Sequence, residues 1–210
     1  MPLELLISSH IGGGWGQEDQ SEAYSEAAWV IRGTDIPDAR CSSVAGVPYR
    51  FHKASNLQSR ALEPCDIIFE VSGGSKGQPV GRTLLMTSEL LSAFNNEAVI
   101  CASFCKRIVP KHDLYCSELL FLSFVEGYES GEIEQYQVQS TGISNFKWTE
   151  YIANTERAVP PKPLQQRFRN VTKNIFRQIA LLGLRSANLR RTRDLLLPRL
   201  LSGQIELEVD

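Results

Sequence analysis

Apolar residues recur at helical spacing over the C-terminal part of the chain. Their successive spacings are 4, 3, 4, 4, 3, 7 and 7 residues, which keeps them on one side of an α-helix. Between Ile175 and Ile179 the pattern departs from a strict heptad, a stutter that relaxes a supercoil locally. We call this set the stripe, and its members are Leu164, Phe168, Val171, Ile175, Ile179, Leu182, Leu189 and Leu196.

Prolines and glycines set the expected ends of this helix. Residues 159–163 read VPPKP, and Pro163 fits the first helical turn, where a missing N–H costs nothing. Pro198 and Gly203 are expected to close the helix, and residues 205–209 alternate like a short final strand. At about 1.5 Å per residue, the helix forms a rod of roughly 50 Å. A rod so long and one-sided predicts a partner helix and a coiled coil.

The first 156 residues predict short strands and helices separated by turn signals. Strand candidates are residues 28–32, 48–51, 66–72, 80–86 and 99–109, and the best internal helix spans residues 114–125. Several of these strands run without alternation, which is typical of strands covered on both faces. The pattern therefore predicts an α+β chain. A mixed α/β domain spans residues 1–156, a proline-rich linker 157–162, and a long coiled-coil-forming helix with a short tail 163–210.

Charge divides the chain at the same boundary. Residues 157–199 hold eleven basic residues and one acidic residue, whereas residues 1–156 hold eleven basic and twenty acidic residues. The formal net charge of −2 thus conceals two regions of opposite sign. A basic helix favours an anionic partner, either the DNA backbone or an acidic protein.

Motifs of the common enzyme classes are missing from the sequence. It contains no GxxxxGK[ST] loop, no HExxH, no GxSxG, and no Asn/Asp-Pro-Pro-Tyr/Phe of an adenine methyltransferase. The three histidines are scattered, and Cys101 and Cys105 have a three-residue gap rather than the two of a zinc motif. We therefore expect no catalytic residue, no metal and no cofactor.

The expected location is the cytoplasm, without membrane contact. No stretch approaches the roughly 18 apolar residues that would span a bilayer, and the N-terminus lacks the basic segment of a secretory signal.

Small polar loops interleaved with basic residues are the feature that indicates a ligand. Gly and Ser allow the backbone to approach a phosphate closely, while Arg, Lys and Asn carry the donors that read base edges. The candidate DNA-binding residues are Arg32, Thr34, Lys53, Ser72, Gly73, Gly74, Ser75, Lys76, Arg82, Lys106, Arg107, Thr141, Ser144 and Lys147. Because the domain is acidic overall, these basic residues would have to gather on one face to bind DNA.

An ordered series of motifs resembles one repeat unit of a type I restriction-modification specificity (S) subunit, over essentially the whole chain. The series is GGGWG (12–16), IRGTDI (31–36), PCDIIFEVSGGS (64–75), STGI (140–143), VPP (159–161) and LLLPRLLSG (195–203). In that family, a target recognition domain reads one half of a bipartite DNA sequence. The helix that follows pairs antiparallel with its counterpart and sets the distance between two such domains.

The resemblance also implies partners. S subunits are not catalytic themselves, and they dock two methyltransferase subunits and, in the full complex, two restriction and motor subunits. By this resemblance the chain would bind double-stranded DNA, a methyltransferase subunit, a restriction subunit and either a second copy of itself or another half-subunit.

Alternatives remain open at this point. A full S subunit has two recognition domains and two helices, so this chain is a natural half-subunit that homodimerises, the product of a truncated gene, or a piece of a longer chain. A coiled-coil adaptor without a DNA role is the second functional hypothesis, and an undetected nuclease or transferase is the third.

Overall fold

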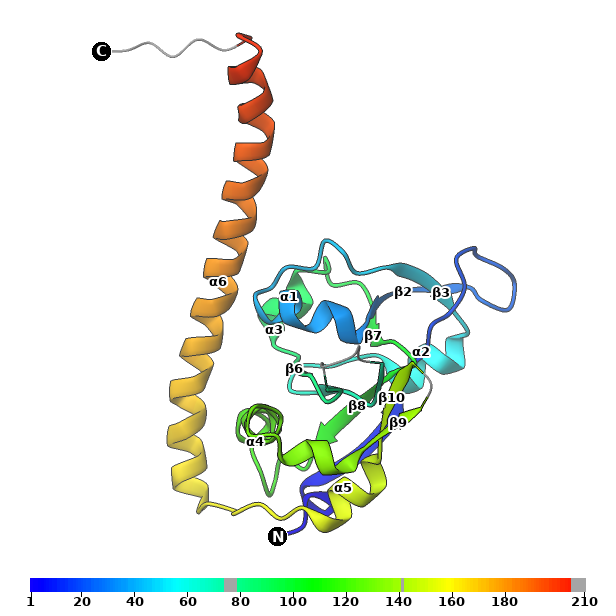
Figure 1. The fold of residues 1–210 in the computed structure, drawn as a ribbon, viewed down its shortest axis with the longest axis vertical. Helices are drawn as coiled ribbons and strands as arrows, with labels where there is room; N and C mark the ends of the chain where they lie inside the picture. Colours follow the sequence, from blue (N-terminus) through cyan, green and yellow to red (C-terminus); the bar gives the residue numbers. More distant parts are fainter. Residues whose placement is uncertain (74–78, 141, 205–210) are drawn as a thin grey trace.

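The computed structural model describes residues 1–73, 79–140 and 142–204. It shows a head, residues 1–156, and a long helix, α6 (Lys162–Leu201), that runs along one side of the head and projects beyond it (Figure 1). The strands are β1 (Ile7–Gly12), β2 (Glu26–Ile31), β3 (Tyr49–His52), β4 (Ile67–Glu70), β5 (Ser72–Gly73), β6 (Thr83–Leu85), β7 (Val99–Cys101), β8 (Cys105–Pro110), β9 (Gln137–Ser140) and β10 (Ile143–Phe146). The helices of the head are α1 (Ile36–Arg40), α2 (Ala54–Arg60), α3 (Ser88–Ser92), α4 (Ser117–Glu129) and α5 (Trp148–Asn154), with 3-10 turns η1 (Leu3–Leu6), η2 (Gly33–Asp35) and η3 (Glu132–Tyr136).

An antiparallel sheet of order β1-β8-β4-β6 forms the centre of the head. Every residue of β4 is buried, and alternate side chains enter two different cores. Ile67 and Phe69 pack with α4 and α5, whereas Ile68 packs with α1, α3 and β7. The prediction of strands covered on both faces is confirmed here, and it explains why the sequence of β4 shows no alternation.

Two smaller sheets flank the central one. In the β3-β2-β7 sheet, β2 pairs antiparallel with β3 and parallel with β7. The β5-β10-β9 sheet is antiparallel and joins segments that are about 70 positions apart in the sequence, with Ser144 opposite Gly73. The predicted α+β class is therefore confirmed, with a long helix after it.

Two element predictions were wrong in detail. Residues 99–109 form two strands in two different sheets, β7 and β8, because the chain turns at residues 102–104. The internal helix covers Ser117–Glu129 rather than 114–125, since the chain first turns at residues 111–115, where Leu114 and Tyr115 donate their backbone N–H groups to the carbonyl of Lys111. The structure also contains β1, β9, β10, α1, α2, α3 and α5, which the sequence pattern did not indicate.

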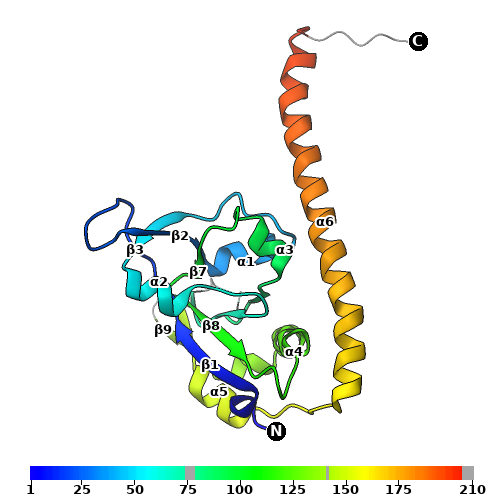
Figure 2. The ribbon, with the colours of Figure 1, turned by 180° about the vertical axis from the view of Figure 1, so that it is seen from behind.

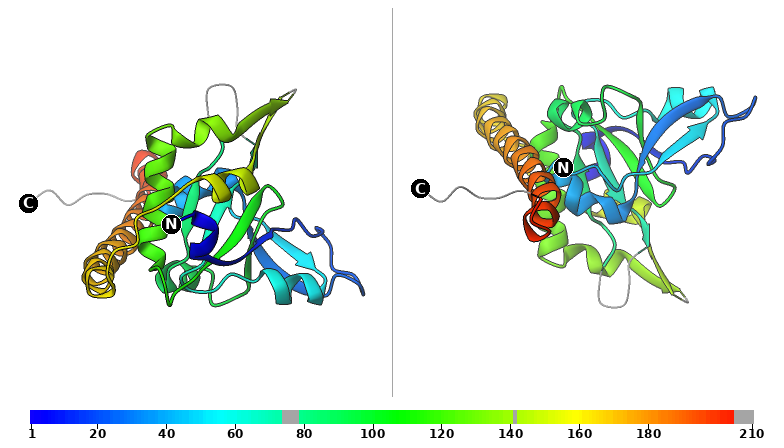
Figure 3. Two further views of the ribbon diagram at one scale, coloured as in Figure 1. Left: turned by 90° about the horizontal axis from the view of Figure 1, so that it is seen from below. Right: turned by 90° about the horizontal axis from the view of Figure 1, so that it is seen from above.

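The start and the end of the head are hydrogen bonded to each other. Leu3 donates its N–H to the carbonyl of Thr155, and the Arg157 N–H donates to the carbonyl of Met1. From there the chain crosses to α6, which lies beside α4 on one side of the head, with β2 and β3 at the opposite side (Figure 3). The far half of α6 extends past the head (Figure 2).

The predicted end of the long helix was placed too early. Pro198 lies inside α6 rather than closing it. Proline removes one N–H from the helix, yet Ser202 donates its N–H to the carbonyl of Pro198, so the turn after the proline still forms. Gly203 has a φ of 71°, which ends the helix as expected. The strand expected over residues 205–209 lies outside the described residues.

Two features are absent from the described part of the chain, a membrane-spanning helix and a metal-binding cluster. Within the described residues, no helix combines the length and the hydropathy that crossing a bilayer requires. Over the same residues, no group of three or more His, Cys, Asp or Glu side chains is arranged to hold a metal ion.

Candidate nucleic-acid interface

Five of the candidate DNA-binding residues line one open pocket of about 600 Å³ in the head. We call it the head pocket. It forms where the start of η2, the end of β4, β5 and the β7–β8 turn meet. The five are Arg32, Thr34, Ser72, Gly73 and Arg82, and the other lining residues are Trp15, Gly33, Glu70, Ala102, Ser103 and Phe104.

A buried ion pair occupies the floor of the head pocket. The Arg82 guanidinium donates to Glu70 through Nε, at 2.8 Å, and Nη2, at 2.6 Å. These hydrogen bonds raise the pKa of Arg82 further above its ordinary value. Gly33 lies against this pair, because a Cβ at this position would overlap Oε1 of Glu70. Arg82 is thus engaged inside the head, and its contact with DNA stays a prediction.

Arg32 lies at the edge of the same pocket and is more accessible. Its Nε and Nη2 donate to the two carboxylate oxygens of Asp35, at 2.9 and 2.7 Å, and Nη2 also donates to the Gly46 carbonyl. The hydrogen bonds that Arg32 donates to Asp35 raise the pKa of Arg32. With 41% of its side chain exposed, Arg32 is held in one orientation and still faces solvent. With Nε and Nη2 held by Asp35 and Gly46, Nη1 is the nitrogen of this fixed guanidinium that can donate to a base edge or a phosphate.

The two polar loops that the sequence suggested for close approach to DNA are neighbours in space. Ser72 donates its hydroxyl to Oδ1 of Asn145, at 2.7 Å, and Ser144 pairs with Gly73 across β5 and β10. Gly73 has a φ of 123°, a conformation that side chains disfavour. Four further candidates, Gly74, Ser75, Lys76 and Thr141, lie outside the described residues.

The remaining candidates do not line the head pocket. Arg107, on β8, donates to Asp66 at 2.7 Å, and burial nevertheless raises the pKa of that carboxyl. Lys147 pairs with Glu150 at 3.1 Å, and Lys53 lies over the ring of Tyr24. Lys106 is opposite Gly12 of β1 in the central sheet. These four residues lie outside the head pocket, and the gathering of the candidates on one basic face stays a prediction.

Sequence reasoning missed two aromatic residues of the head pocket. Trp15 is 41% exposed and lies under the guanidinium of Arg50, at 4.7 Å. Phe104 is 52% exposed in the turn between β7 and β8. Trp15 stands in the glycine-rich GGGWG segment, which was a usable signal. The exposed position of Phe104 could not be predicted, because the sequence pattern indicated one continuous strand over residues 99–109.

Positive charge without a carboxylate partner is concentrated on α6. Among the described residues, Arg167, Lys173, Arg177 and Arg185 form no ion pair, whereas Arg193 pairs with Asp194. By contrast, arginines 32, 50, 82 and 107 of the head and Arg157 just after it pair with carboxylates of the head, while Arg40 and Arg60 bond to neutral groups of the head. The helix therefore carries the stronger unpaired positive charge of the two regions.

The stripe of α6 is mostly exposed in this structure. Leu182 is 60% and Leu189 71% exposed, and Phe168 is half-buried. The other five stripe residues, Leu164, Val171, Ile175, Ile179 and Leu196, are exposed as well. A row of large apolar side chains in water is unfavourable, at roughly 25 cal/mol per Å² of apolar surface, so this face of α6 is suited to a partner.

Comparison with solved structures gives the fold. A crystal structure of the type I restriction-modification system S subunit from M. genitalium aligns with 96% of this chain at a TM-score of 0.55 and 13% sequence identity. The chain has the fold of about half of a type I S subunit. It covers 45% of the M. genitalium S subunit, so it spans less than half the length of that protein.

A second solved structure aligns with 95% of this chain and with 44% of the length of its own chain, at 18% sequence identity and a TM-score of 0.49. It is described as the structural basis underlying complex assembly and conformational transition of the type I R-M system. No protein-family model and no curated protein matches the sequence. The S-subunit fold includes the long helix, since the alignment with the M. genitalium protein covers nearly the whole chain.

Proposed function

We propose that this chain is a non-catalytic DNA-specificity module of a type I restriction-modification system. Its head reads one half of a bipartite DNA sequence, and α6 holds that head at a fixed distance from a second head. The observation that carries the proposal is the stripe, a row of apolar side chains exposed on a helix whose fold relatives are S subunits. The domain division expected from the sequence, with a boundary at residues 157–162, is part of this proposal.

Pairing through the stripe would bring two heads into one assembly. A second copy of this chain or another half-subunit supplies the partner helix, and two-fold symmetry between copies would make the recognised site an interrupted palindrome. The assembly would then dock a methyltransferase subunit, which supplies catalysis, and a restriction subunit in the full complex.

The head pocket supports a role in reading DNA. Arg32 is held in one orientation by Asp35, Thr34 and Phe104 are exposed beside it, and the close-approach backbone of Ser72 and Gly73 adjoins them. Donors fixed before binding lose less conformational freedom on binding, which favours affinity and specificity. Unpaired basic residues of α6 would neutralise DNA phosphates and make binding salt-dependent.

Mapping of modified bases tests the proposal in cells. The chain is expressed with its neighbouring methyltransferase in cells that lack this modification, and methylated sites are sequenced. We expect a bipartite motif with a fixed spacer. A contiguous motif, or methylation of the same sites without the chain, would contradict the proposal.

A matched pair of variants tests the head pocket. Phe104→Asp places a negative charge at the pocket, and Leu5→Asp places the same charge on a side chain of similar exposure, 55% against 52%, in η1. We expect Phe104→Asp to weaken duplex binding by about tenfold or more, because a carboxylate repels phosphate. Leu5→Asp should leave binding unchanged. Equal effects of the two variants would remove the head pocket from the interface.

One observation favours the second candidate function, a coiled-coil adaptor without a DNA role. Arg32, Arg82 and Arg107 of the head pair with carboxylates of the head, while most basic residues of α6 form no ion pair among the described residues, so an acidic protein could bind there. The adaptor predicts that Phe104→Asp leaves both assembly and methylation intact. It also predicts that the purified chain shows no sequence preference among duplexes.

A further inference from the structure

A second face of α6 fastens the helix to its own head. The residues on it are Gln165, Arg169, Thr172, Phe176, Ala180 and Gly183, which we call the clamp residues. Each follows a stripe residue by one position, and one position rotates a side chain by about 100° around the helix axis. The stripe and the clamp residues therefore occupy separate faces, and the stripe stays accessible while the head is attached.

Gln165 anchors the start of the helix. It is 4% exposed, accepts the N–H of Cys116 at 2.9 Å, and donates to the carbonyls of Leu114 and Pro160 at 3.1 and 2.8 Å. One side chain thus joins α6 to the segment before α4 and to the linker. Because all three partners are backbone groups, this anchor fixes the position of α6 along its axis.

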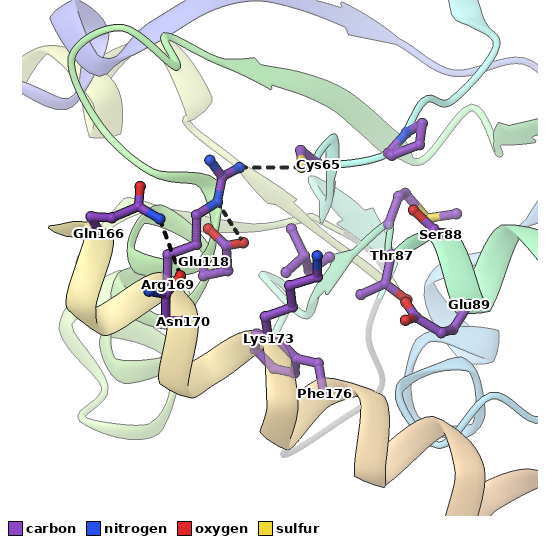
Figure 4. Close-up of a pocket in the computed structure, with 13 residues that line it drawn as sticks. Cys65, Thr87, Ser88, Glu89, Glu118, Gln166, Arg169, Asn170, Lys173 and Phe176 are labelled. Carbon is purple, nitrogen blue, oxygen red and sulfur yellow. Dashed lines mark hydrogen bonds and ion pairs between the residues drawn. The ribbon is translucent and has the colours of Figure 1, made fainter.

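One turn later, Arg169 bridges the helix to two parts of the head. Its Nε donates to Glu118 at 3.2 Å, and Nη2 lies 3.7 Å from the sulfur of Cys65 (Figure 4). Lys173 follows along the same cleft, which has a volume of about 340 Å³. The cleft shows that α6 and the head are not fully packed at this level, so the orientation depends on the contacts on either side of it.

Beyond the cleft the packing becomes apolar and then very close. The ring of Phe176 meets that of Phe121 edge to face, with centroids 5.8 Å apart, and Ala180 is 4% exposed. At Gly183 the helix touches the turn after α1, because a Cβ at this position would overlap the carbonyl oxygen of Cys41. A side chain at this position would force the helix and the head apart.

Because α6 extends well beyond Gly183, a small change of tilt at the contact between Gly183 and Cys41 moves the far end of the helix by a larger distance. Leu201 lies 18 residues beyond Gly183, a distance of about 27 Å along the helix axis. A tilt of about 10° at Gly183 would move that end by roughly 5 Å relative to the head. This displacement exceeds the ~3.4 Å between successive base pairs of DNA.

We propose that Gly183 is a spacing-determining residue. Its contact with the Cys41 carbonyl fixes the tilt of the head against α6, and through that tilt it sets the distance between two heads paired through the stripe. The proposal rests on the proposed function, because it concerns the spacer between two DNA half-sites. It predicts that the spacer depends on this contact as well as on the length of the helix.

The geometry is tested without DNA. Spin labels are introduced as non-canonical amino acids at Lys111 of the head and Ser202 after α6, in full chain diluted with unlabelled chain. We expect Gly183→Ala to move the mean distance by several ångströms. Asn188→Ala also raises helix propensity, but on an exposed position of α6, and should leave the distance unchanged.

A second variant keeps the proposal testable if the Gly183→Ala protein does not fold. Phe176→Ala removes the ring contact without adding bulk, so it should broaden the distance distribution without moving its mean. Distances identical to those of the unmodified chain in both variants would overturn the proposed role of the clamp residues.

The DNA arm uses a duplex library with two randomised segments separated by spacers of increasing length. The unmodified chain should enrich one spacer, and Gly183→Ala should lower the enrichment of that spacer by about tenfold in favour of another, an effect like that of one mismatched base pair. Enrichment of the same spacer by both proteins would overturn the role of Gly183 in spacing. If the unmodified chain enriches no bipartite sequence at all, the proposed function fails with it.

Discussion

The two halves of α6 differ in what covers them. From Gln165 to Gly183, the clamp residues pack against the head, whereas from Leu184 to Leu201 every side chain except the half-buried Leu200 is exposed. An isolated helical segment such as Leu184–Leu201 draws little stability from propensity alone when nothing packs against it. The first half of α6 therefore belongs to the head by its packing, and the second half depends on a partner for its stability.

Charged substitutions in the stripe give the largest expected effect. Leu182→Asp with Leu189→Asp would place unpaired carboxylates in the helix pair, each costing several kcal/mol. We expect the dissociation constant of the pair to rise by about a thousandfold or more. Sedimentation over a range of concentrations measures the change from dimer to monomer.

Asn188→Asp is the control for that experiment, since it adds the same charge at an exposed position outside the stripe. It should leave the dimer intact. A chain that is monomeric before any substitution would contradict the difference between the two halves, because Leu184–Leu201 would then be helical without a partner.

Two adjacent glutamines test the clamped half. Gln165→Ala leaves the buried N–H of Cys116 without its acceptor and removes two further hydrogen bonds, so we expect a loss of about 2–4 kcal/mol in the free energy of unfolding. Among the described residues, the side chain of the exposed Gln166 bonds to Asn170 alone, within α6, and Gln166→Ala should cost less than about 0.5 kcal/mol. Denaturant titration compares the two variants. Equal losses would show that α6 is not anchored to the head through Gln165.

The stability of the head should depend on pH through His52, an effect smaller than those of the substitutions above. His52 is fully buried, neither ring nitrogen has a hydrogen-bond partner among the described residues, and burial lowers its pKa. The unfolded chain therefore binds a proton that the folded head resists. Stability should fall as the pH drops below the unfolded pKa of about 6.5, by up to about 1.4 kcal/mol per pH unit.

Replacing the ring identifies the group responsible. In His52→Phe this part of the pH dependence should disappear, whereas α6, which contains no histidine, should keep its helicity across the same range. Thermal unfolding and circular dichroism between neutral and mildly acidic pH provide the measurement. An unchanged pH dependence in His52→Phe would assign the effect to another group.

The long helix could be predicted from the sequence because its signal is regular and local. The stripe repeats over more than thirty residues, and the prolines mark its start. The face that meets the head could not be predicted, since Gln165, Thr172 and Gly183 carry no apolar pattern. Their burial depends on the position of α4 and of the turn after α1, which no local spacing reveals.

The head also contains elements that the sequence predicts and elements that it does not. β4 was predicted because all its residues are buried and the sequence runs apolar without interruption. β1 was not, since most of its side chains are exposed or half-buried. Among the site residues, the sequence does not distinguish Arg82 and Arg107, which are paired inside the head, from the exposed Arg32. Only the fold brings Asp66 and Glu70 to them and leaves Arg32 exposed.

Hydrogen exchange along α6, measured as a function of protein concentration, separates the clamped half from the half that needs a partner. We expect amides of residues 165–183 to be protected at every concentration. Amides of residues 184–201 should exchange rapidly in dilute protein and become protected as copies pair through the stripe. Equal protection of both halves, independent of concentration, would contradict the claim that the free half of α6 exists to be paired.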